Sequence, residues 1–330
     1  MRRSGFLCAG LASLLLAIAS STVASQQRER VTIAWLPIMQ TTAFYVAMEE
    51  KLFEKAGLDV EAVRFEAPNQ IIDSLVSGRV DVGAPGAAAG IATLAEAQFP
   101  GTFKVFGLQG GGIKVDRIND GLIVAKASPI ASFADLKGKT LGHLPGIQWR
   151  TISRYMVRKA GLDPDRDVRL VELAVGLQVQ AIVAGTVDAT LSLEPVGSIA
   201  IGVGEAKRAV TNPVASVIAD PFYSGVSLLT TKFIKERPAV ARKVVEVLDE
   251  ATAIANRDFV KVRAILPKYT ALKGDQTGIV AQPYLRAFAE LDATDLASYQ
   301  ALVDVFSSEG VLKRKFDVRD IVLKSSDLGS

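Results

Sequence analysis

Few side chains in this 330-residue chain could carry out catalytic chemistry. His143 is the only histidine and Cys8 the only cysteine, so a histidine or thiolate cluster for a metal cannot form. A Ser-His-Asp triad around His143 stays formally open, but no Gly-x-Ser-x-Gly elbow accompanies it. Gly138-Lys139-Thr140 matches the end of a phosphate-binding loop, yet Phe133 stands where that motif requires glycine. We therefore expect no enzyme, cofactor or metal.

Other side chains could hold a small molecule without reacting with it. Trp35 and Trp149 offer aromatic surface, Arg150 could pair with a carboxylate or sulfonate, and Glu194 could receive a cationic or N–H group. Each has a plainer interpretation. Trp35 could be a core aromatic, Arg150 a solvated charge, Glu194 a partner within its own domain, and His143 a hydrogen-bonding residue at a strand end. Their places along the predicted strands decide between these readings.

Composition and charge narrow the class of protein. Apolar residues make up 49% of the chain and charged residues 22%, which is too apolar for a disordered protein. The formal net charge is +3 and no basic cluster is present, so we expect no nucleic-acid partner. At roughly 100–200 residues per domain, the length suggests two domains or one large one.

The first 25 residues have the layout of a secretory signal peptide. Arg2 and Arg3 give a positive start, residues 11–19 form an apolar run, and Val23-Ala24-Ser25 offers small residues for cleavage. An uncleaved anchor is the alternative, but the run is shorter than the roughly 20 residues that span a bilayer. Cys8 precedes the run, which argues against a lipoprotein. Cleavage would leave 36 basic and 35 acidic residues, no cysteine, and a mature protein in the periplasm.

The chain contains an internal repeat. Three motifs recur in the same order, at offsets of 108, 104 and 107 residues, and three matches in register are hard to attribute to chance. Each copy has a strand-like run ending in Leu-Pro, then Lys-Ala-Gly-Leu-Asp, then a helix-like run closed by Gly-x-Val-Asp. The matching segments are 31–37 and 139–145, Lys55–Asp59 and Lys159–Asp163, and 78–81 and 185–188.

Each copy predicts a β–α–β–α–β unit. In the first copy, the hydroxyl of Thr41 or Thr42 is expected to cap the first helix, and Gly57 and Gly78 are expected to end the two helices. The predicted strands are 31–36, 59–65, 80–84, 140–144, 168–173 and 187–193, and the predicted helices are 41–56, 69–77, 148–160 and 177–184.

Strand–helix–strand units form parallel sheets, so two copies predict two α/β lobes. Helices predicted at 238–257, 282–291 and 298–309 have no counterpart in the repeat, and we expect them to pack back on the first lobe. The chain would then cross between lobes near 122–127 and near 224–230, forming a hinge. The predicted organisation is lobe 1 from 26–122 and 230–330, and lobe 2 from 123–229, opened by a capping box at 132–135.

Ligands of open α/β sheets bind beyond the carboxyl ends of the strands, so the cleft between the lobes is the expected pocket. Pro85 and Gly86 lead into a predicted helix at 87–97, whose free N–H groups would suit an anion, although both could be simple turn formers. Gly107 and Gly110–Gly112 are expected to form a flexible loop at a strand end. The expected ligand-binding residues are Trp35, Pro37, Thr41, Thr42, Pro85, Gly86, Gly111, His143, Gly146, Gln148, Trp149, Arg150, Glu194 and Tyr223.

Several motifs resemble one known family over about residues 31–316. The chain looks like the periplasmic solute-binding proteins of ABC importers for alkanesulfonates, taurine and nitrate, which share a domain with thiamine-pyrimidine synthases. The segments that carry the resemblance are 52–60, 78–83, 134–140, 159–162, 185–189 and 194–195.

This resemblance implies a type II periplasmic binding fold, with two α/β lobes, two crossover strands and a ligand between the lobes. It also implies ligand contacts from the loops after the first and third strands of each lobe. Family members often have a Ser/Thr-rich loop where this chain has Gly146-Ile147-Gln148-Trp149-Arg150. That departure favours an organic ligand, anionic and aromatic or sulfonate-like, over a small inorganic anion.

The sequence thus predicts a monomeric receptor that closes on a small ligand and delivers it to an ABC permease and ATPase complex. One alternative is a binding protein that feeds a sensor, which uses the same closure. A thiamine-pyrimidine-synthase-like enzyme is a further alternative. That class is understood to use a histidine as reactant and a cysteine-rich iron site, which one histidine and no mature cysteine do not supply.

Overall fold

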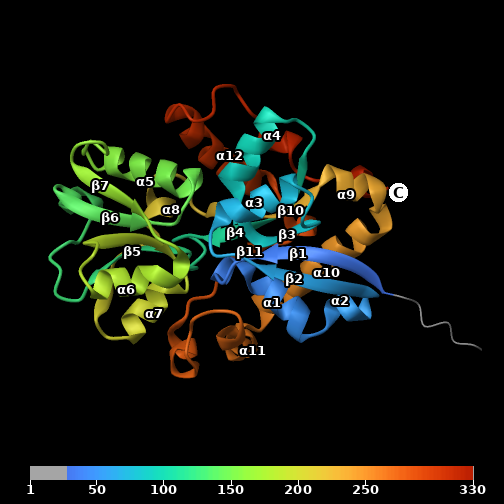
Figure 1. Cartoon of the computed structure of the whole chain (residues 1–330), viewed down its shortest axis with the longest axis horizontal. Helices are drawn as coiled ribbons and strands as arrows, with labels where there is room; N and C mark the ends of the chain where they lie inside the picture. Colours follow the sequence, from blue (N-terminus) through green and yellow to red (C-terminus); the bar gives the residue numbers. More distant parts are fainter. Residues whose placement is uncertain (1–27, 330) are drawn as a thin grey trace, which may run out of the picture.

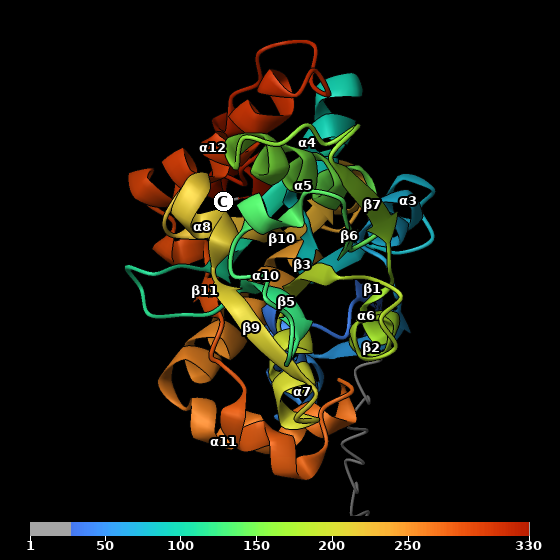
Figure 2. The same ribbon diagram turned by 90° about the vertical axis from the view of Figure 1, so that its left-hand side faces the viewer.

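Two lobes lie side by side in the computed structural model, which describes residues 28–329. The second lobe is on the left in Figure 1 and faces the viewer in Figure 2. The expected signal peptide and Cys8 lie outside the described residues. None of the helices within residues 28–329 has the length and apolar character that a bilayer crossing requires.

The first lobe is built on a six-stranded sheet in the order β11-β4-β10-β3-β1-β2. β1, β2 and β3 are parallel, as the repeat predicts, whereas β10 is antiparallel to its neighbours β3 and β4. Successive residues of β1 enter different cores, since Ile33 belongs to one hydrophobic cluster and Ala34 to the other. The strands are β1 (Glu29–Trp35), β2 (Leu58–Arg64), β3 (Val82–Ala88), β4 (Phe103–Gly111), β10 (Phe222–Thr230) and β11 (Tyr284–Arg286).

Helices cover both faces of this sheet. The long helix α10 has the bounds that its apolar period predicts, and it packs against α1 in the first lobe as expected. α4 and α12 pack together near the top of the molecule in Figure 1. The helices are α1 (Thr42–Glu49), α2 (Leu52–Lys55), α3 (Pro68–Val76), α4 (Ala89–Gln98), α9 (Thr231–Glu236), α10 (Pro238–Arg257), α11 (Phe259–Ile265) and α12 (Ala293–Ser308).

The second lobe repeats the pattern on a five-stranded sheet in the order β7-β6-β8-β5-β9. β6, β7 and β8 are parallel, and β5 is antiparallel to β8 and β9. The capping box that opens this lobe is confirmed, because the Asp135 carboxylate accepts hydrogen bonds from the Ser132 N–H and hydroxyl. The elements are β5 (Asp120–Ala125), β6 (Lys139–His143), α5 (Ile147–Lys159), β7 (Val168–Glu172), α6 (Gln178–Val183), β8 (Ala189–Leu193), α7 (Val196–Gly202), β9 (Ala206–Thr211) and α8 (Pro213–Val217).

The chain passes between the sheets earlier than predicted. It leaves the first sheet at the end of β4 and enters the second at β5, and it returns between α8 and β10. Residues 122–125 and 224–230, which were expected to cross between the lobes, are internal to the sheets as parts of β5 and β10. Both strands pair on two sides, which is why they cannot serve as free connections.

Four local predictions are wrong. The first predicted helix is broken at Lys51, whose φ is 55°, and the expected helix at 282–291 is replaced by β11 and a 3₁₀ turn. β3 continues through Pro85 and Gly86 to Ala88, so α4 begins two residues later than expected. The expected glycine loop is largely strand, because Gly107, Gly110 and Gly111 lie buried in β4. A side chain at Gly110 would collide with the Phe222 carbonyl of β10, which explains glycine there.

Candidate functional site

A cavity of about 210 Å³ lies between the lobes, where the carboxyl ends of their parallel strands face each other. The first lobe contributes residues that follow β1 and end β2, and the second contributes the segments before and in α6 and α7. Such edges are where open α/β sheets bind ligands. The lining residues are Pro37, Arg64, Glu66, Val175, Gly176, Val179, Gln180, Pro195, Val196, Ile199 and Ala271.

An aromatic group supports the first-lobe wall. Trp35 ends β1 and packs edge-on against Tyr45 and Tyr269, whose rings stack on each other at 4.5 Å. The Tyr45 hydroxyl donates to the carbonyls of Leu36 and Ile38, at 2.7 and 2.9 Å, and so fixes the loop that carries Pro37. Burial raises the pKa of Tyr45 above its usual value, which keeps this donor protonated.

Trp35 is 9% exposed, as expected for a core aromatic, but its indole N–H has no hydrogen-bond partner. The Arg64 guanidinium lies 5.7 Å from the centre of the indole. Arg64 also pairs with Glu66 at 2.8 Å, and about half of each side chain is exposed. These two residues are the only charged groups among the described residues that line the cavity.

The second-lobe wall is apolar apart from the Gln180 amide. Pro195, Val196 and Ile199 come from the start of α7, and the carboxylate of the preceding Glu194 does not line the cavity. That carboxylate is 2% exposed, pairs with Arg208 and accepts a hydrogen bond from the Ser198 hydroxyl at 2.6 Å. The plainer reading of Glu194, as a partner within its own lobe, matches this geometry.

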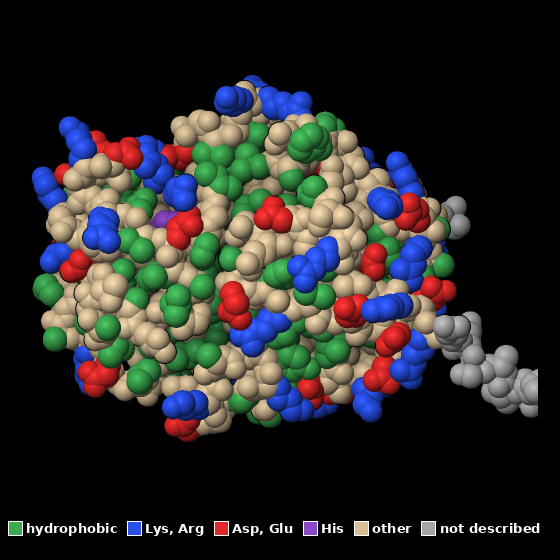
Figure 3. Space-filling view, viewed as in Figure 1, with side chains coloured by type: hydrophobic (Ala, Val, Ile, Leu, Met, Phe, Trp, Pro, Cys, Tyr) green, Lys and Arg blue, Asp and Glu red, His purple; other side chains and the backbone are tan. Residues whose placement is uncertain are grey.

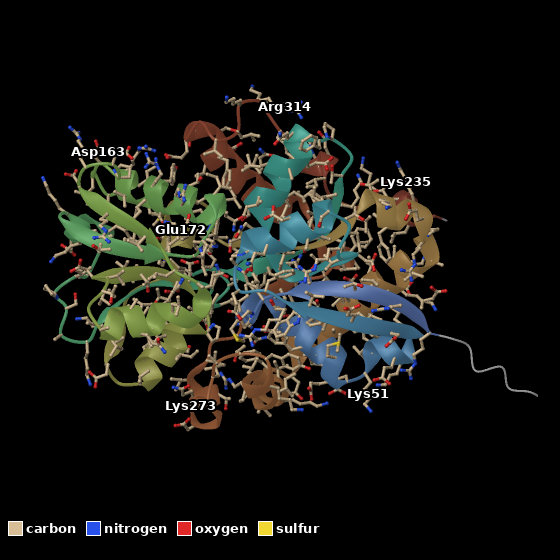
Figure 4. The ribbon with its side chains drawn as sticks, in the orientation of Figure 1. Lys51, Asp163, Glu172, Lys235, Lys273 and Arg314 are labelled. Atoms are coloured by element: carbon tan, nitrogen blue, oxygen red, sulfur yellow. The ribbon has the colours of Figure 1, made fainter. Side chains whose placement is uncertain are left out.

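A late segment of the chain closes the lower side of the cavity. Residues 269–280 belong to the first lobe in sequence order but reach α7, where the Ser198 hydroxyl lies 3.5 Å from the Ile279 carbonyl. Ala271 from this segment lines the cavity, and Gln276 packs against Gly202. Figure 4 labels Lys273 on this segment, below the boundary between the lobes. We call residues 269–280 the strap.

Two buried glutamines lie where the lobes meet, and one of them joins the lobes directly. The Gln148 amide of the second lobe accepts from the Gly90 N–H at 2.6 Å and donates to the Ser224 carbonyl at 2.9 Å, both in the first lobe. The Gln40 amide donates to Asn119, in the passage between lobes, at 2.6 Å and to the Ser224 hydroxyl at 2.8 Å. Both glutamines are at most 3% exposed, so the lobes are in close contact here.

The passage between the lobes is anchored by a buried carboxylate. Asp120, the first residue of β5, is fully buried and accepts from the Asn119 amide at 2.9 Å and the Val214 N–H at 3.2 Å. Burial raises the pKa of Asp120 to about 6, with the nearby Glu194 adding to the rise. This carboxylate therefore carries a desolvation cost whenever it is ionised.

The helix cap predicted at Thr41 or Thr42 and the anion-binding helix terminus predicted after Gly86 are not found as predicted. The Thr42 hydroxyl donates to the Met39 carbonyl instead of accepting from a helix N–H, and the buried Thr41 hydroxyl has no partner. Gly86, with φ of 96°, packs against Thr41. The Gly90 N–H at the start of α4, expected to face an anion, already donates to Gln148.

Three of the expected residues lie on or in the second lobe away from the cavity. The Nδ1 of His143 lies 2.7 Å from the Leu144 carbonyl, and burial lowers its pKa. Arg150 is exposed and pairs with Glu172 at 2.5 Å, and with His143 it lines a separate groove. Trp149 is 1% exposed and belongs to the hydrophobic core.

The remaining expected ligand-binding residues contact other parts of the protein. The Tyr223 hydroxyl donates to Asp295 at 2.5 Å inside the first lobe. Gly111 lies against Arg117 and Asn119 in the passage between lobes, and Gly146, with φ of 100°, lies beside Asn69 of the first lobe. Among the expected ligand-binding residues, Pro37 lines the cavity, and Gln148 and Gly146 lie against the other lobe. That these residues bind a ligand stays a prediction.

Sequence reasoning missed the cavity residues at the end of the second strand of each lobe. Arg64 ends β2 and Glu66 follows it, and the segment Val175–Gln180 follows β7, yet expectation centred on the loops after first and third strands. Both segments lie at or just after the end of the second strand in their copy of the repeat, and that shared place is the signal that could have found them. Within residues 28–329, no group of three or more His, Cys, Asp or Glu side chains is placed to hold a metal ion.

The fold is that of the periplasmic binding proteins, as predicted. The alkanesulfonate-binding protein SsuA from Xanthomonas axonopodis pv. citri, bound to MOPS, aligns with a TM-score of 0.73 at 19% identity, covering 91% of this chain and 99% of that one. The nitrate-binding protein NrtA from Synechocystis PCC 6803 aligns at 0.71 and 14% identity, covering 92% and 87%. The desulfurization enzyme DSZB shares the fold at 0.68 and 16% identity, covering 91% and 98%.

Sequence comparison then gives the family. The NMT1/THI5-like family model matches residues 38–258, and the chain belongs to that family. A Brucella abortus protein named provisionally as a binding protein is 26% identical over 255 residues, covering 76% of this chain and 73% of that protein. The bicarbonate transport ATP-binding protein CmpC of Synechococcus elongatus is 28% identical over 201 residues, and the match spans 53% of this chain but only 28% of that protein.

Proposed function

We propose that this protein is the extracytoplasmic ligand-binding component of an ABC importer and captures a small organic molecule between its lobes. The observation that carries the proposal is the interlobe cavity, whose walls come from both lobes and from the strap. A ligand that touches both lobes binds the closed arrangement better than an open one, so it shifts the population toward closure.

The two passages between the lobes support a closing motion. Each runs between the end of an element in one lobe and the start of an element in the other, so the lobes have no continuous strand in common. Hinges of this kind absorb backbone rotation at a few residues between rigid elements. The closed pair of lobes would form the surface that a membrane permease and its ATPase recognise, and a single copy of the chain suffices for it.

The family relatives include binding and transport proteins, and the shared fold also includes an enzyme. The composition of the cavity favours binding over catalysis. Its described lining residues contain no serine, threonine, cysteine, histidine or lysine, and the one carboxylate among them, that of Glu66, is paired with Arg64.

The charge pattern of the surface does not favour a polyanionic partner. On the face shown in Figure 3, basic and acidic side chains are interspersed without a continuous basic region. Protein–nucleic acid recognition usually requires such a region.

Mass spectrometry of any compound released on denaturing the purified protein tests the proposal. Small-angle scattering of the stripped protein should then show a smaller radius of gyration after that compound is added back. The N-terminus of the exported protein, expected at Gln26, tests the compartment in the same sample. If the stripped protein neither compacts nor gains thermal stability with the released compound or with sulfonates, carboxylates and N-heterocycles, the proposal fails.

A further inference from the structure

We infer that the interlobe cavity selects an uncharged, mainly apolar small molecule with one group that both donates and accepts hydrogen bonds, rather than an anion. The inference rests on the proposed function and names the chemical class of its ligand. Three observations carry it: the balance of charge in the cavity wall, the occupied helix terminus, and the apolar lining.

The charges that line the cavity already neutralise each other. Arg64 and Glu66 form an ion pair at 2.8 Å, and these two residues contribute one positive and one negative charge. An incoming carboxylate or sulfonate would have to compete with Glu66 for the guanidinium and would lie close to the displaced carboxylate. Like charges at such short range oppose each other, so the pair disfavours a ligand anion.

The next basic group behind the wall is also neutralised. Arg208 pairs with the buried carboxylate of Glu194, next to Pro195 of the cavity lining. Breaking that pair would leave a carboxylate that is 2% exposed without its partner, which is costly in a buried place. Arg208 is therefore held within the second lobe and is not available to a ligand.

The helix terminus that would suit an anion is occupied by the protein itself. The Gly90 N–H in the first turn of α4 donates to the Gln148 amide oxygen at 2.6 Å. The same amide donates to the Ser224 carbonyl, so Gln148 spans the two lobes. Neither Gly90 nor Gln148 lines the cavity, and a ligand oxyanion could accept from the Gly90 N–H only by displacing the Gln148 amide oxygen.

The rest of the cavity favours an apolar body. Pro37, Val179, Val196, Ile199 and Ala271 are among the side chains that surround it. Its volume, about 210 Å³, is below the roughly 300 Å³ at the lower end for drug-sized ligands, so the ligand is small. The polar part of the lining combines the N–H groups of Arg64 with the carboxylate of Glu66 and the amide of Gln180. An amide or alcohol can accept from the first and donate to the second without disturbing the charge balance.

Butanamide and butanoate are suitable probes because they have nearly the same size and differ in charge. We expect butanamide at millimolar concentration to raise the melting temperature of the stripped full-length protein and butanoate to have little effect. Ala271→Trp should abolish the response, since Ala271 lines the cavity from the strap and is exposed, so that the larger side chain can be accommodated. Ala289→Trp is the matched control, because Ala289 is also exposed but does not line the cavity.

A second variant tests the charge argument directly. Glu66→Gln leaves Arg64 without its carboxylate, so it should strengthen butanoate binding by up to about fivefold, the factor expected for a half-exposed pair. Stronger binding of butanoate than of butanamide by the unaltered protein, lost in Ala271→Trp, would replace the inference with an anion site. A butanamide response that persists in Ala271→Trp, or no response to either probe, would show that this cavity is not the binding site. In either case the released compound and the scattering measurement still test the proposed function independently.

Discussion

Replacement of Gln148 by alanine tests whether this side chain holds the lobes together. In the structure its amide makes two buried hydrogen bonds across the lobe boundary, to the Gly90 N–H and the Ser224 carbonyl. Gln148→Ala removes both and adds no bulk, and in an open arrangement water can satisfy the two groups that lose their partner.

The size of the effect follows from the two bonds. A neutral intramolecular hydrogen bond contributes about 0.5–1.5 kcal/mol net, so the closed arrangement should lose about 1–3 kcal/mol relative to the open one. That difference corresponds to a change of roughly 5- to 150-fold in the ratio of closed to open molecules. The folded lobes themselves should keep their stability, because the lost bonds lie between them.

Two measurements on ligand-free protein would detect the change. Small-angle scattering should report a larger radius of gyration for Gln148→Ala, and hydrogen exchange should report faster exchange at the Gly90 amide. Gln300→Ala is the control, since Gln300 also bonds through both ends of its amide, to Asp304, the Phe316 carbonyl and the Val318 N–H, but all within the first lobe. An unchanged radius and an unchanged Gly90 exchange rate in Gln148→Ala would refute the reasoning.

Three further changes have expected outcomes. Because burial raises the pKa of Asp120 to about 6, the folded state disfavours its ionised form, so the free energy of unfolding should rise as the pH falls through 6 toward 4. The rise in the free energy of unfolding is up to about 3 kcal/mol for a shift of about two pKa units. Urea titrations of Asp120→Asn should lack this pH-dependent component. A pH profile identical to that of the unaltered protein would contradict the assignment. Trp149→Ala should lower the free energy of unfolding by about 3–5 kcal/mol, since Trp149 is 1% exposed in the core, and a merely weakened ligand affinity with full stability would instead make it a cavity wall. Gly110→Ala should destabilise the first sheet by at least about 1–3 kcal/mol because its Cβ meets the Phe222 carbonyl, whereas Gly274→Ala, with open space around it, should change stability by less than about 1 kcal/mol.

The repeat predicted most of the strands and helices to within about two residues, because its signals are local. Hydrophobic runs, Gly57, Gly78, Gly161 and Gly185 act within one or two turns of chain, and each of these glycines has positive φ in the structure. The errors occur where a distant strand decides the outcome. β3 continues through Pro85 because β10, more than a hundred residues later, pairs with its far end.

The candidate site was harder to predict for the same reason. Placement of a residue after a strand indicates that it lies near the sheet edge, but not whether its side chain points to solvent, to the core or to the other lobe. Trp149 and Gln148 are neighbours on α5, yet the first lies in the core and the second spans the lobes. Arg64 and Glu66 were missed because the end of β2 becomes a cavity wall only where residues of the second lobe lie opposite it.

The order of strands in the first sheet has a consequence for synthesis. β10 lies between β4 and β3, although the whole second lobe separates it from them in the chain. During synthesis β3 and β4 emerge first, and the edge of each that pairs with β10 stays unpaired until about residue 230 has been made. The second lobe is continuous in the sequence, so it can fold before the first sheet is complete. We expect the early segment to depend on export chaperones, and pulse-chase proteolysis of nascent chains should find the second lobe resistant first.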